Sequence, residues 1–314
     1  MPPTVTRRSL ELAGLSVPLV EVTGSHDGPL LSVIAGVHGC EYASMAGVRR
    51  WLRGLETRDI SGRVRAVPVL NVSAFAARTP FLVPEDGKNL NRCFPGDPAG
   101  TLAERLAYDA FMQVITGSDA YIDAHCGDMV EALQPFALYE AGPAEDSARD
   151  LAIAYQLPYV IRQVAGPDRA VSGTSSGAAA AAGIPAITAE AGECGLVQEH
   201  AVAMHVAGLN GVLELLGMAD ESQGAAAAGA QQTQPEQTEL SRFLWLRCRD
   251  AGWWEPAVGA GAAVRSGQVI GTVSTLDGAQ VMEEIIAPAD GVIIFLTSSP
   301  AVAADGLLFG LGAR

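Results

Sequence analysis

The segment LLSVIAGVHGCEYASMAGVRRWLRGL, residues 30–55, combines two apolar patterns that favour different elements. Residues 30–37 form a short, mostly apolar run, which is typical of a buried strand. Residues 41–55 instead carry their large apolar side chains at the three- and four-residue spacing of one helical face. His38 and Glu41 therefore lie where a strand is expected to end and a helix to begin.

Strand-like and helix-like patterns alternate through the first two thirds of the chain. Such alternation is typical of an α/β fold, in which helices cover a sheet. The carboxyl ends of the strands in an open α/β sheet form the edge at which ligands bind. We expect further strands at residues 17–22, 64–72, 120–124 and 186–189, and helices at residues 102–115, 151–157 and 195–216.

The composition changes after residue 218. Residues 219–239 contain runs of alanine and glutamine and almost no large apolar side chain, so they cannot bury a core and are expected to be a linker. From residue 240 to residue 314, short β-like runs are separated by glycine and proline turns. The sequence therefore predicts a catalytic domain at residues 1–218, a low-complexity linker at 219–239 and a small all-β domain at 240–314.

Composition also restricts the class of partner. With 49% apolar and 18% charged residues the chain is expected to be globular, and its net charge of −15 argues against nucleic acid or a membrane surface. The apolar stretches are shorter than the roughly 20 residues that a membrane helix requires. A small-molecule substrate fits better. Lys88 is the only lysine, so arginines such as Arg78 and Arg92 become the candidates for recognising a carboxylate.

The five cysteines are an odd number without paired spacing, which argues against a secreted disulfide framework and favours a reducing cytoplasm. Arg7 and Arg8 resemble a twin-arginine export signal, but Glu11 and Glu21 interrupt the apolar region that should follow. Most of the cysteines lie within two residues of a candidate site residue. They are either a thiolate metal set or redox sensor, or small apolar side chains that pack around a pocket, and we favour packing.

Four side chains near the ends of expected strands have the chemistry of a metal site. His38 and Glu41 are three residues apart, so both can reach one ion across a helical turn. His125 and Glu190 each follow an expected strand. Two imidazoles and one carboxylate form a ligand set that leaves a fourth zinc position open for water. Glu190 is then the candidate base for that water, with Glu193 as its competitor.

The order of these motifs resembles the succinylglutamate desuccinylase and aspartoacylase family, a branch of the zinc carboxypeptidase superfamily. The resemblance covers most of residues 30–217, and its motifs are specific as a set. It implies a zinc-carboxypeptidase-like three-layer α/β sandwich with a mixed sheet. The motifs are GVHGCE at residues 36–41, NVSAF at 71–75 followed by Arg78, NLNRCFPG at 89–96, DAH at 123–125 and TAEAG at 188–192.

The resemblance also implies a role for each matching residue. One Zn²⁺ per chain would be held by His38, Glu41 and His125, with Glu190 as the general base. This chemistry is coherent, because zinc can lower the pKa of a bound water to about 7 and a carboxylate can take the proton as that water attacks an amide carbon.

Substrate contacts follow from the same resemblance. Asn91 and Arg92 would bind the substrate carboxylate, and Arg78 would polarise the scissile carbonyl and its oxyanion. Asp123 either orients a ligand histidine or has a purely structural role. His200 and His205 lie in the helix expected after the site, and we interpret both as structural.

The C-terminal domain resembles a lipoyl/biotinyl-like β-sandwich, with residues 287–293 the nearest match. It contains no lysine. Covalent lipoylation or biotinylation, which needs a lysine at a hairpin tip, is therefore not expected. The domain would shape either the pocket entrance or an oligomer interface.

The sequence thus predicts a zinc-dependent amidohydrolase that removes the acyl group from an N-acyl amino acid or a related small carboxylate. One alternative is a zinc metallocarboxypeptidase that acts on a peptide C-terminus. A second alternative is a catalytically silent metabolite-binding protein that kept the fold. The sequence leaves open the acyl group and the oligomeric state, a homo-oligomer included.

Overall fold

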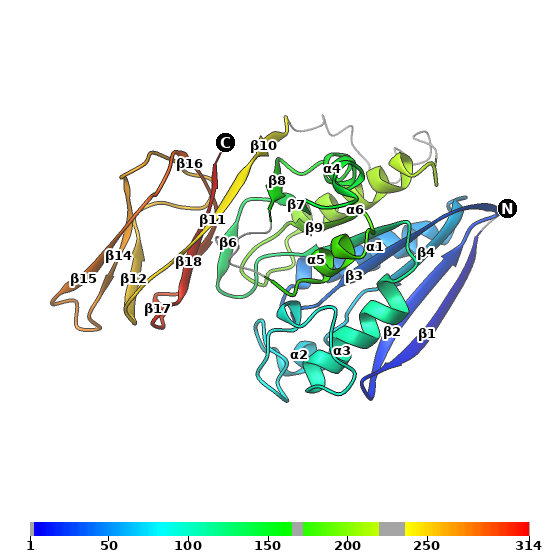
Figure 1. Ribbon diagram of the computed structural model, residues 1–314, viewed down its shortest axis with the longest axis horizontal. Coiled ribbons are helices and arrows are strands. Elements are labelled where there is room, and N and C mark those ends of the chain that lie inside the picture. The colour runs from blue at the N-terminus through cyan, green and yellow to red at the C-terminus, as the bar shows by residue number, and fades with distance from the viewer. Residues whose placement is uncertain (1–2, 165–171, 220–235, 314) are drawn as a thin grey trace.

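The computed structural model describes residues 3–164, 172–219 and 236–313. The chain forms a large α/β part and a smaller part, which lies at the left of Figure 1 and runs in colour from yellow to red. Within the described residues, the large part contains a nine-stranded sheet in the order β1-β2-β4-β3-β5-β9-β7-β8-β10. Its strands are β1 (Thr4–Leu12), β2 (Leu15–Thr23), β3 (His26–Ala35), β4 (Ser61–Val67), β5 (Ala120–His125), β7 (Phe136–Glu140), β8 (Tyr159–Gln163), β9 (Ala186–Glu190) and β10 (Thr238–Leu240).

The central strand β5 positions the site. It is parallel to β3 on one side and to β9 on the other, so the three strands end at the same edge of the sheet. The register places Glu190, the last residue of β9, beside His125, the last residue of β5. Strand β7 is antiparallel to β9 and makes the sheet mixed. All of β5 is buried, as expected for a strand whose two faces are both covered.

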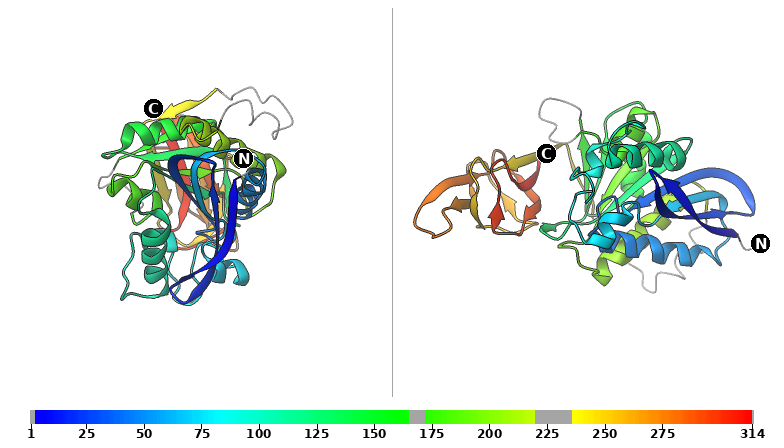
Figure 2. Two further views of the ribbon diagram at one scale, coloured as in Figure 1. Left: turned by 90° about the vertical axis from the view of Figure 1, so that its right-hand side faces the viewer. Right: turned by 90° about the horizontal axis from the view of Figure 1, so that it is seen from below.

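Helices cover both faces of the large sheet (Figures 1 and 2). Along β3, Leu31 and Val33 belong to one buried cluster and Ile34 to a second, because successive side chains of a strand point to opposite faces. Helices α1, α4 and α6 bury their apolar sides in the first cluster, and α3 and α5 contribute to the second. The expected three-layer α/β sandwich is confirmed. The helices are α1 (Tyr42–Leu55), α2 (Val72–Ala77), α3 (Leu102–Ala110), α4 (Glu145–Ala154), α5 (Ser175–Ala181), α6 (Glu199–Leu215), the 3-10 turn η1 (Leu90–Arg92) and the π turn η2 (Phe111–Ile115).

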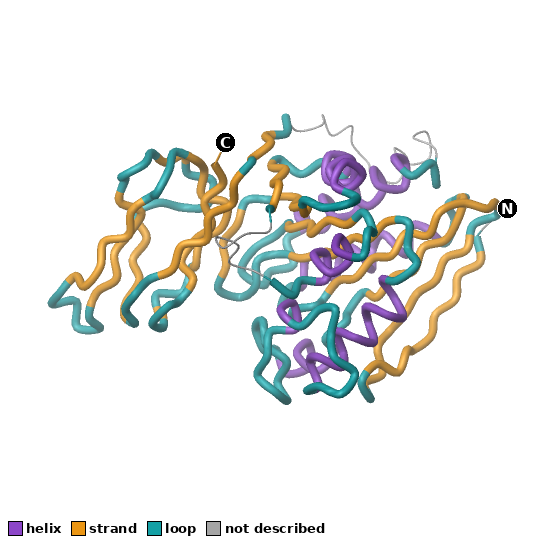
Figure 3. The backbone as a smooth tube through the Cα atoms, in the orientation of Figure 1, coloured by secondary structure: helices purple, strands orange, loops and turns teal. Residues whose placement is uncertain are grey.

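The smaller part contains strands and no helix in its described residues, as Figure 3 shows. One sheet has the order β11-β18-β16-β13 with β6 added on β16, and the other has the order β15-β14-β12-β17. Trp254, Ile270 and Phe309 are buried between the two sheets. The expected all-β C-terminal domain is confirmed. Its strands are β11 (Arg242–Arg247), β12 (Gly252–Pro256), β13 (Ala263–Val264), β14 (Val269–Ser274), β15 (Val281–Ile286), β16 (Gly291–Thr297), β17 (Ala301–Val302) and β18 (Leu307–Ala313).

Two strands connect the large part to the small one. Strand β6 (Glu131–Leu133) follows β5 in the chain and pairs antiparallel with β16 of the small part. Strand β10 pairs with β8 in the large sheet. A single residue, Ser241, separates β10 from β11, which belongs to the small part. Hydrogen-bonded backbone therefore fixes the small part against the large one.

The structure differs from the sequence expectations at several element boundaries. The strand expected at residues 64–72 ends at Val67, because Pro68 has no N–H to donate to a neighbouring strand. The sequence patterns do not predict strands β1, β6, β7, β8 and β10. Of the expected linker, residues 220–235 lie outside the described residues, and β10 begins at Thr238. Within the described part of the chain, every helix is too short or too polar to cross a membrane.

Candidate metal centre and active site

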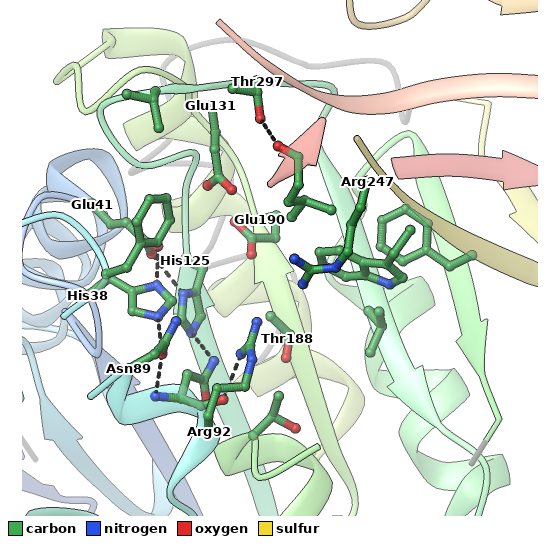
Figure 4. Close-up of a pocket in the computed structure, with 18 of the residues that line it drawn as sticks. His38, Glu41, Asn89, Arg92, His125, Glu131, Thr188, Glu190, Arg247 and Thr297 are labelled. Carbon is green, nitrogen blue, oxygen red and sulfur yellow. Dashed lines mark hydrogen bonds and ion pairs between the residues drawn. The ribbon is translucent and has the colours of Figure 1, made fainter. Parts of the chain in front are cut away.

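His38, Glu41 and His125 converge at the carboxyl edge of the sheet (Figure 4). His38 follows β3, Glu41 immediately precedes α1, and His125 ends β5. Nδ1 of His38 lies 2.5 Å from one carboxylate oxygen of Glu41, and Nδ1 of His125 lies 2.8 Å from the other. One ligand atom from each residue lies within 4.8 Å of the other two, and all three residues are buried. This donor set fits a single zinc ion.

The outer nitrogen of each imidazole is held by an oxygen. Nε2 of His38 lies 3.0 Å from Oδ1 of Asn89, and Nε2 of His125 lies 3.0 Å from Oδ2 of Asp123. Those oxygens can accept a hydrogen bond from Nε2, and in that tautomer each Nδ1, which faces Glu41, would have its lone pair available for a metal. Asp123 is thus placed to orient His125, which is one of the two roles that the sequence left open.

A buried hydrogen-bond network supports Asp123 in turn. The hydroxyl of Ser175 donates to Oδ2 of Asp123 at 2.5 Å, and the hydroxyl of Tyr121 donates to Ser175 at 2.9 Å. The backbone N–H of Ser175 donates to Oδ1 of Asn91 at 2.9 Å. Asn91 is therefore fixed by the same serine that fixes Asp123, and its Nδ2 lies 3.3 Å from Nε2 of His125.

The electrostatics of the centre favour a cation. Burial by itself raises the pKa of Glu41, but the imidazoles of His125 and His38 outweigh burial and bring that pKa to about 2. Burial lowers the pKa of His125, whereas Asp123 and Glu41 raise it well above its usual value. The carboxylates around the two imidazoles therefore create a negative potential, which a divalent cation would neutralise.

Glu190 lies beside this centre. Burial raises its pKa well above the usual value; His125 opposes that shift, whereas the nearby carboxylates of Glu41 and Glu131 add to it. Burial, together with Glu41, also raises the pKa of Glu131 to about 7. Figure 4 shows the carboxylates of Glu131 and Glu190 directed into the same space. The centre therefore has a carboxylate close by with a high affinity for a proton.

A cavity of about 520 Å³ opens onto the centre. Its volume suits a small organic molecule. Part of its wall is apolar and comes from Phe136, Leu138, Phe243 and Trp245. Six of the seven expected site residues line it together: His38, Glu41, Asn91, Arg92, His125 and Glu190.

Arg78 is the seventh expected residue, and it does not line this cavity. It is exposed at the C-terminal end of α2. Phe81 occupies the cavity wall instead, with its ring centroid 5.7 Å from that of His38. A contact between Arg78 and a scissile carbonyl stays a prediction. Glu193, the competitor of Glu190, accepts a hydrogen bond from the backbone N–H of Leu133 and also lies outside the cavity wall.

His205 and the cysteines have surroundings typical of structural residues. Nδ1 of His205 lies 2.9 Å from the hydroxyl of Tyr155, and Nε2 lies 3.1 Å from the carbonyl oxygen of Ala191. His200 is exposed. All five cysteines are free thiols, and none of them lines the cavity within the described part of the chain. Cys126, for example, packs in a small buried apolar cluster.

Three further residues of the site were missed by sequence reasoning. Asn89 belongs to the NLNR motif, so that motif carried a signal for it. Glu131 comes from β6 and Arg247 from β11, and both line the cavity. Neither lies in a recognisable motif, because their positions depend on pairing between distant segments.

This is an α/β protein that holds a buried His-Glu-His ligand set and an adjacent carboxylate at the ends of parallel strands. The sequence model described as succinylglutamate desuccinylase/aspartoacylase catalytic domain matches residues 27–216, and the chain belongs to this family.

Similar proteins agree with that assignment. The chain is 38% identical over 148 residues to an N-alpha-acetyl-L-2,4-diaminobutyric acid deacetylase of Halomonas elongata; the match covers 45% of this chain and 42% of that protein. A product-bound structure of the ectoine utilization protein EutE (DoeB) from Ruegeria pomeroyi superposes with a TM-score of 0.83 at 22% identity, over 100% of this chain and 99% of the other. A succinylglutamate desuccinylase/aspartoacylase structure from Rhodobacter sphaeroides gives a TM-score of 0.81 at 22% identity, over 98% and 94%. These two structures share the fold of this chain.

Proposed function

We propose that this chain is a zinc-dependent amidohydrolase that removes the acyl group from an N-acyl amino acid or a related small carboxylate. The observation that carries the proposal is that the three ligand residues and Glu190 face one small cavity. Membership of the family and the similarity to a deacetylase support the same reaction.

His38, Glu41 and His125 would hold the zinc, which would supply a Lewis acid that lowers the pKa of water and stabilises an oxyanion. Asp123 and Asn89 hold the two imidazoles with their Nδ1 atoms directed at the centre. A fixed orientation of the ligands keeps the cost of reorganisation low during the reaction.

Glu190 acts as the general base. Its carboxylate lines the cavity beside His125, so it can accept a proton from the attacking water. The same carboxyl group then delivers that proton to the nitrogen of the leaving amine. One residue at the end of β9 therefore serves both proton transfers.

Arg92 binds the carboxylate of the substrate. Its Nη1 donates to the backbone carbonyl of Asn91 at 2.7 Å, which leaves further N–H groups for a ligand in the cavity. Within the described residues, no carboxylate lies at ion-pair distance from this guanidinium. A substrate carboxylate would complete its hydrogen bonding in bidentate fashion.

The metallocarboxypeptidase alternative is less well supported by the cavity. Thr297, Val302 and Leu307 of the small part form one wall, so the site is bounded on the side away from the large sheet. A bounded cavity suits a small N-acyl amino acid better than an extended peptide. The silent-binding alternative is weakened by the complete set of ligands and base. A cytoplasmic location and a homo-oligomer also stay predictions from the sequence.

The test is zinc content together with release of free amine from N-acetyl, N-succinyl and N-formyl amino acids. Wild-type protein should contain about one zinc per chain and release amine in a chelator-sensitive way. The Glu190→Gln variant should keep its zinc and lose at least about 100-fold in kcat, because the base is removed.

Glu193→Gln is the matched control, since Glu193 lies close in sequence but outside the cavity wall. It should retain zinc and near wild-type turnover. Undiminished turnover in Glu190→Gln would overturn the role of Glu190 as base. Stoichiometric zinc without amine release in the wild type would instead favour the peptidase or the binding protein.

A further inference from the structure

Strand β11 of the small part presents alternate side chains to the cavity. Phe243, Trp245 and Arg247 line the cavity, whereas Leu244 and Leu246 pack in the core of the small part. This is the two-residue period of a strand that has one face on a core and the other on a cavity. One wall of the site is therefore aromatic and ends in a guanidinium.

Arg247 is anchored at one nitrogen and available at the others. Its Nη1 donates to the backbone carbonyl of Asp305 at 2.7 Å. The pairing of β11 with β18 shifts register between Leu246 and Arg247, an irregularity of the kind that redirects side chains near active sites. Figure 4 shows the guanidinium extending into the cavity on the side of Glu190.

Arg92 and Arg247 face the same cavity. Burial is the largest cause of the lowered pKa of Arg92, and the positive charge of Arg247 lowers it further, against an opposing contribution from Glu131. In the part of the chain that the structure describes, neither guanidinium has a carboxylate at ion-pair distance. Two cations that repel each other across a cavity are stabilised when a ligand supplies negative charge to both.

The backbone holds Arg247 at a fixed place over the site. The N–H of Gln134 donates to Ile294 O at 2.7 Å, and the N–H of Ser298 donates to Val130 O at 2.8 Å, so β6 is continuous with the sheet that contains β11. A fixed guanidinium loses little conformational entropy on binding a carboxylate. Arg247 in this fixed position is therefore better suited to binding a ligand carboxylate than a mobile surface arginine would be.

We propose that Arg247 is a substrate-binding residue contributed by the C-terminal part, and that it binds a second carboxylate of the substrate. The proposal rests on the proposed function, in which Arg92 binds the first carboxylate. Phe243 and Trp245, next to Arg247 on the same wall, contact the methylene groups that separate the second carboxylate from the scissile amide. The second carboxylate belongs either to the acyl group or to the side chain of the amino acid.

The experiment measures binding in the absence of turnover. Zinc-loaded Glu190→Gln protein is titrated calorimetrically with two isosteric pairs of ligands. The first pair is N-acetyl-L-glutamate and N-acetyl-L-glutamine. The second pair is N-succinyl-L-alanine and the analogue in which the carboxylate of the succinyl group is replaced by an amide. In one pair the carboxylate should bind about 10- to 100-fold more tightly than the amide, as expected for a charge-assisted hydrogen bond. The pair that shows this preference identifies which half of the substrate carries the second carboxylate.

In the Glu190→Gln background, the further substitution Arg247→Gln should abolish the preference, because it weakens binding of the carboxylate ligand and leaves binding of the amide ligand unchanged. Arg247→Lys in the same background should restore part of the preference. Arg242→Gln is the matched control, because Arg242 is exposed at the other end of β11 and does not line the cavity; it should leave the preference intact. The proposal is overturned if neither pair shows a preference, or if the preference survives Arg247→Gln. Failure of the proposed function would appear separately, as absence of amine release by the wild-type protein.

Discussion

Asp123 shows how one residue behind the candidate ligands can affect the proposed metal site. It accepts hydrogen bonds from His125 and from Ser175, at 3.0 and 2.5 Å. In Asp123→Asn the amide keeps the shape but loses the negative charge that orients the imidazole. We expect zinc affinity to fall about 10- to 100-fold, measured by competition with a chromogenic chelator.

The exposed Asp250→Asn variant is the control for a lost carboxylate, since Asp250 pairs with Arg249 far from the centre. Its zinc affinity should equal that of the wild type. Equal affinities in Asp123→Asn and the wild type would show that Asp123 supports the strand and not the ligand.

His205 makes stability depend on pH. Burial lowers its pKa from 6.5 to about 4 in the folded protein. The unfolded chain therefore binds a proton below pH 6.5 that the folded chain resists, so this contribution to stability is present above pH 6.5 and is lost as pH falls toward 4. Between pH 7 and pH 5, His205 should remove about 2 kcal/mol from the free energy of unfolding.

Urea unfolding at the two pH values measures this effect in the wild type and in His205→Gln. The variant cannot gain the proton, so its loss of stability between pH 7 and pH 5 should be smaller by the same amount. An identical pH dependence in both proteins would assign the acid sensitivity to other groups.

At the scale of elements, helix α1 holds Glu41 against the sheet by packing on α6. A Cβ at Gly47 would lie only 2.5 Å from the Cβ of His205, whereas a Cβ at Gly54 would have no neighbour within 4 Å. Gly47→Ala should therefore destabilise the protein by about 1–3 kcal/mol through overpacking. Gly54→Ala should stabilise it by about 0.5–1 kcal/mol, because alanine favours a helix.

Urea titrations of the two single variants test this contrast within one helix. If both substitutions shifted the midpoint in the same direction, the close contact between α1 and α6 would not limit the stability of the protein.

The elements that the sequence predicted well have strong internal patterns. The strand before His38 and the helix after Glu41 are examples, since a buried run and a helical stripe each reflect one environment. Strand β1 was missed because its exposed edge position tolerates charged residues such as Arg7 and Arg8. Strand β10 has only three residues, and its pairing with β8 depends on tertiary contacts that no local pattern encodes.

At the scale of the whole molecule, His38, Glu41 and His125 come together because they lie at or just after the ends of β3 and β5, two adjacent parallel strands that end at the same edge of the sheet. The second wall of the cavity could not be predicted from the sequence. Arg247 and Glu131 are brought to the site by the pairing of β6 with β16 and by the placement of β11, which join segments more than 100 residues apart. Local patterns fix the direction of a side chain on its own element and leave its distant neighbours undefined.

The same connections predict that the two parts unfold together. Ile294 of β16 is fully buried in a cluster with Phe136, Leu138, Ile161 and Leu240, all four of which belong to the large sheet. Calorimetry should therefore show one transition whose calorimetric and van't Hoff enthalpies agree. Ile294→Ala should lower the Tm of that single transition through a loss of about 2–5 kcal/mol. Ile270 lies within the core of the small part alone. Ile270→Ala should nevertheless lower the Tm of the same transition, because the shared cluster and the pairing of β6 with β16 couple the small part to the large sheet. Two separate transitions, with only one shifted by Ile270→Ala, would show that the parts fold independently and that the cavity wall from β11 can detach.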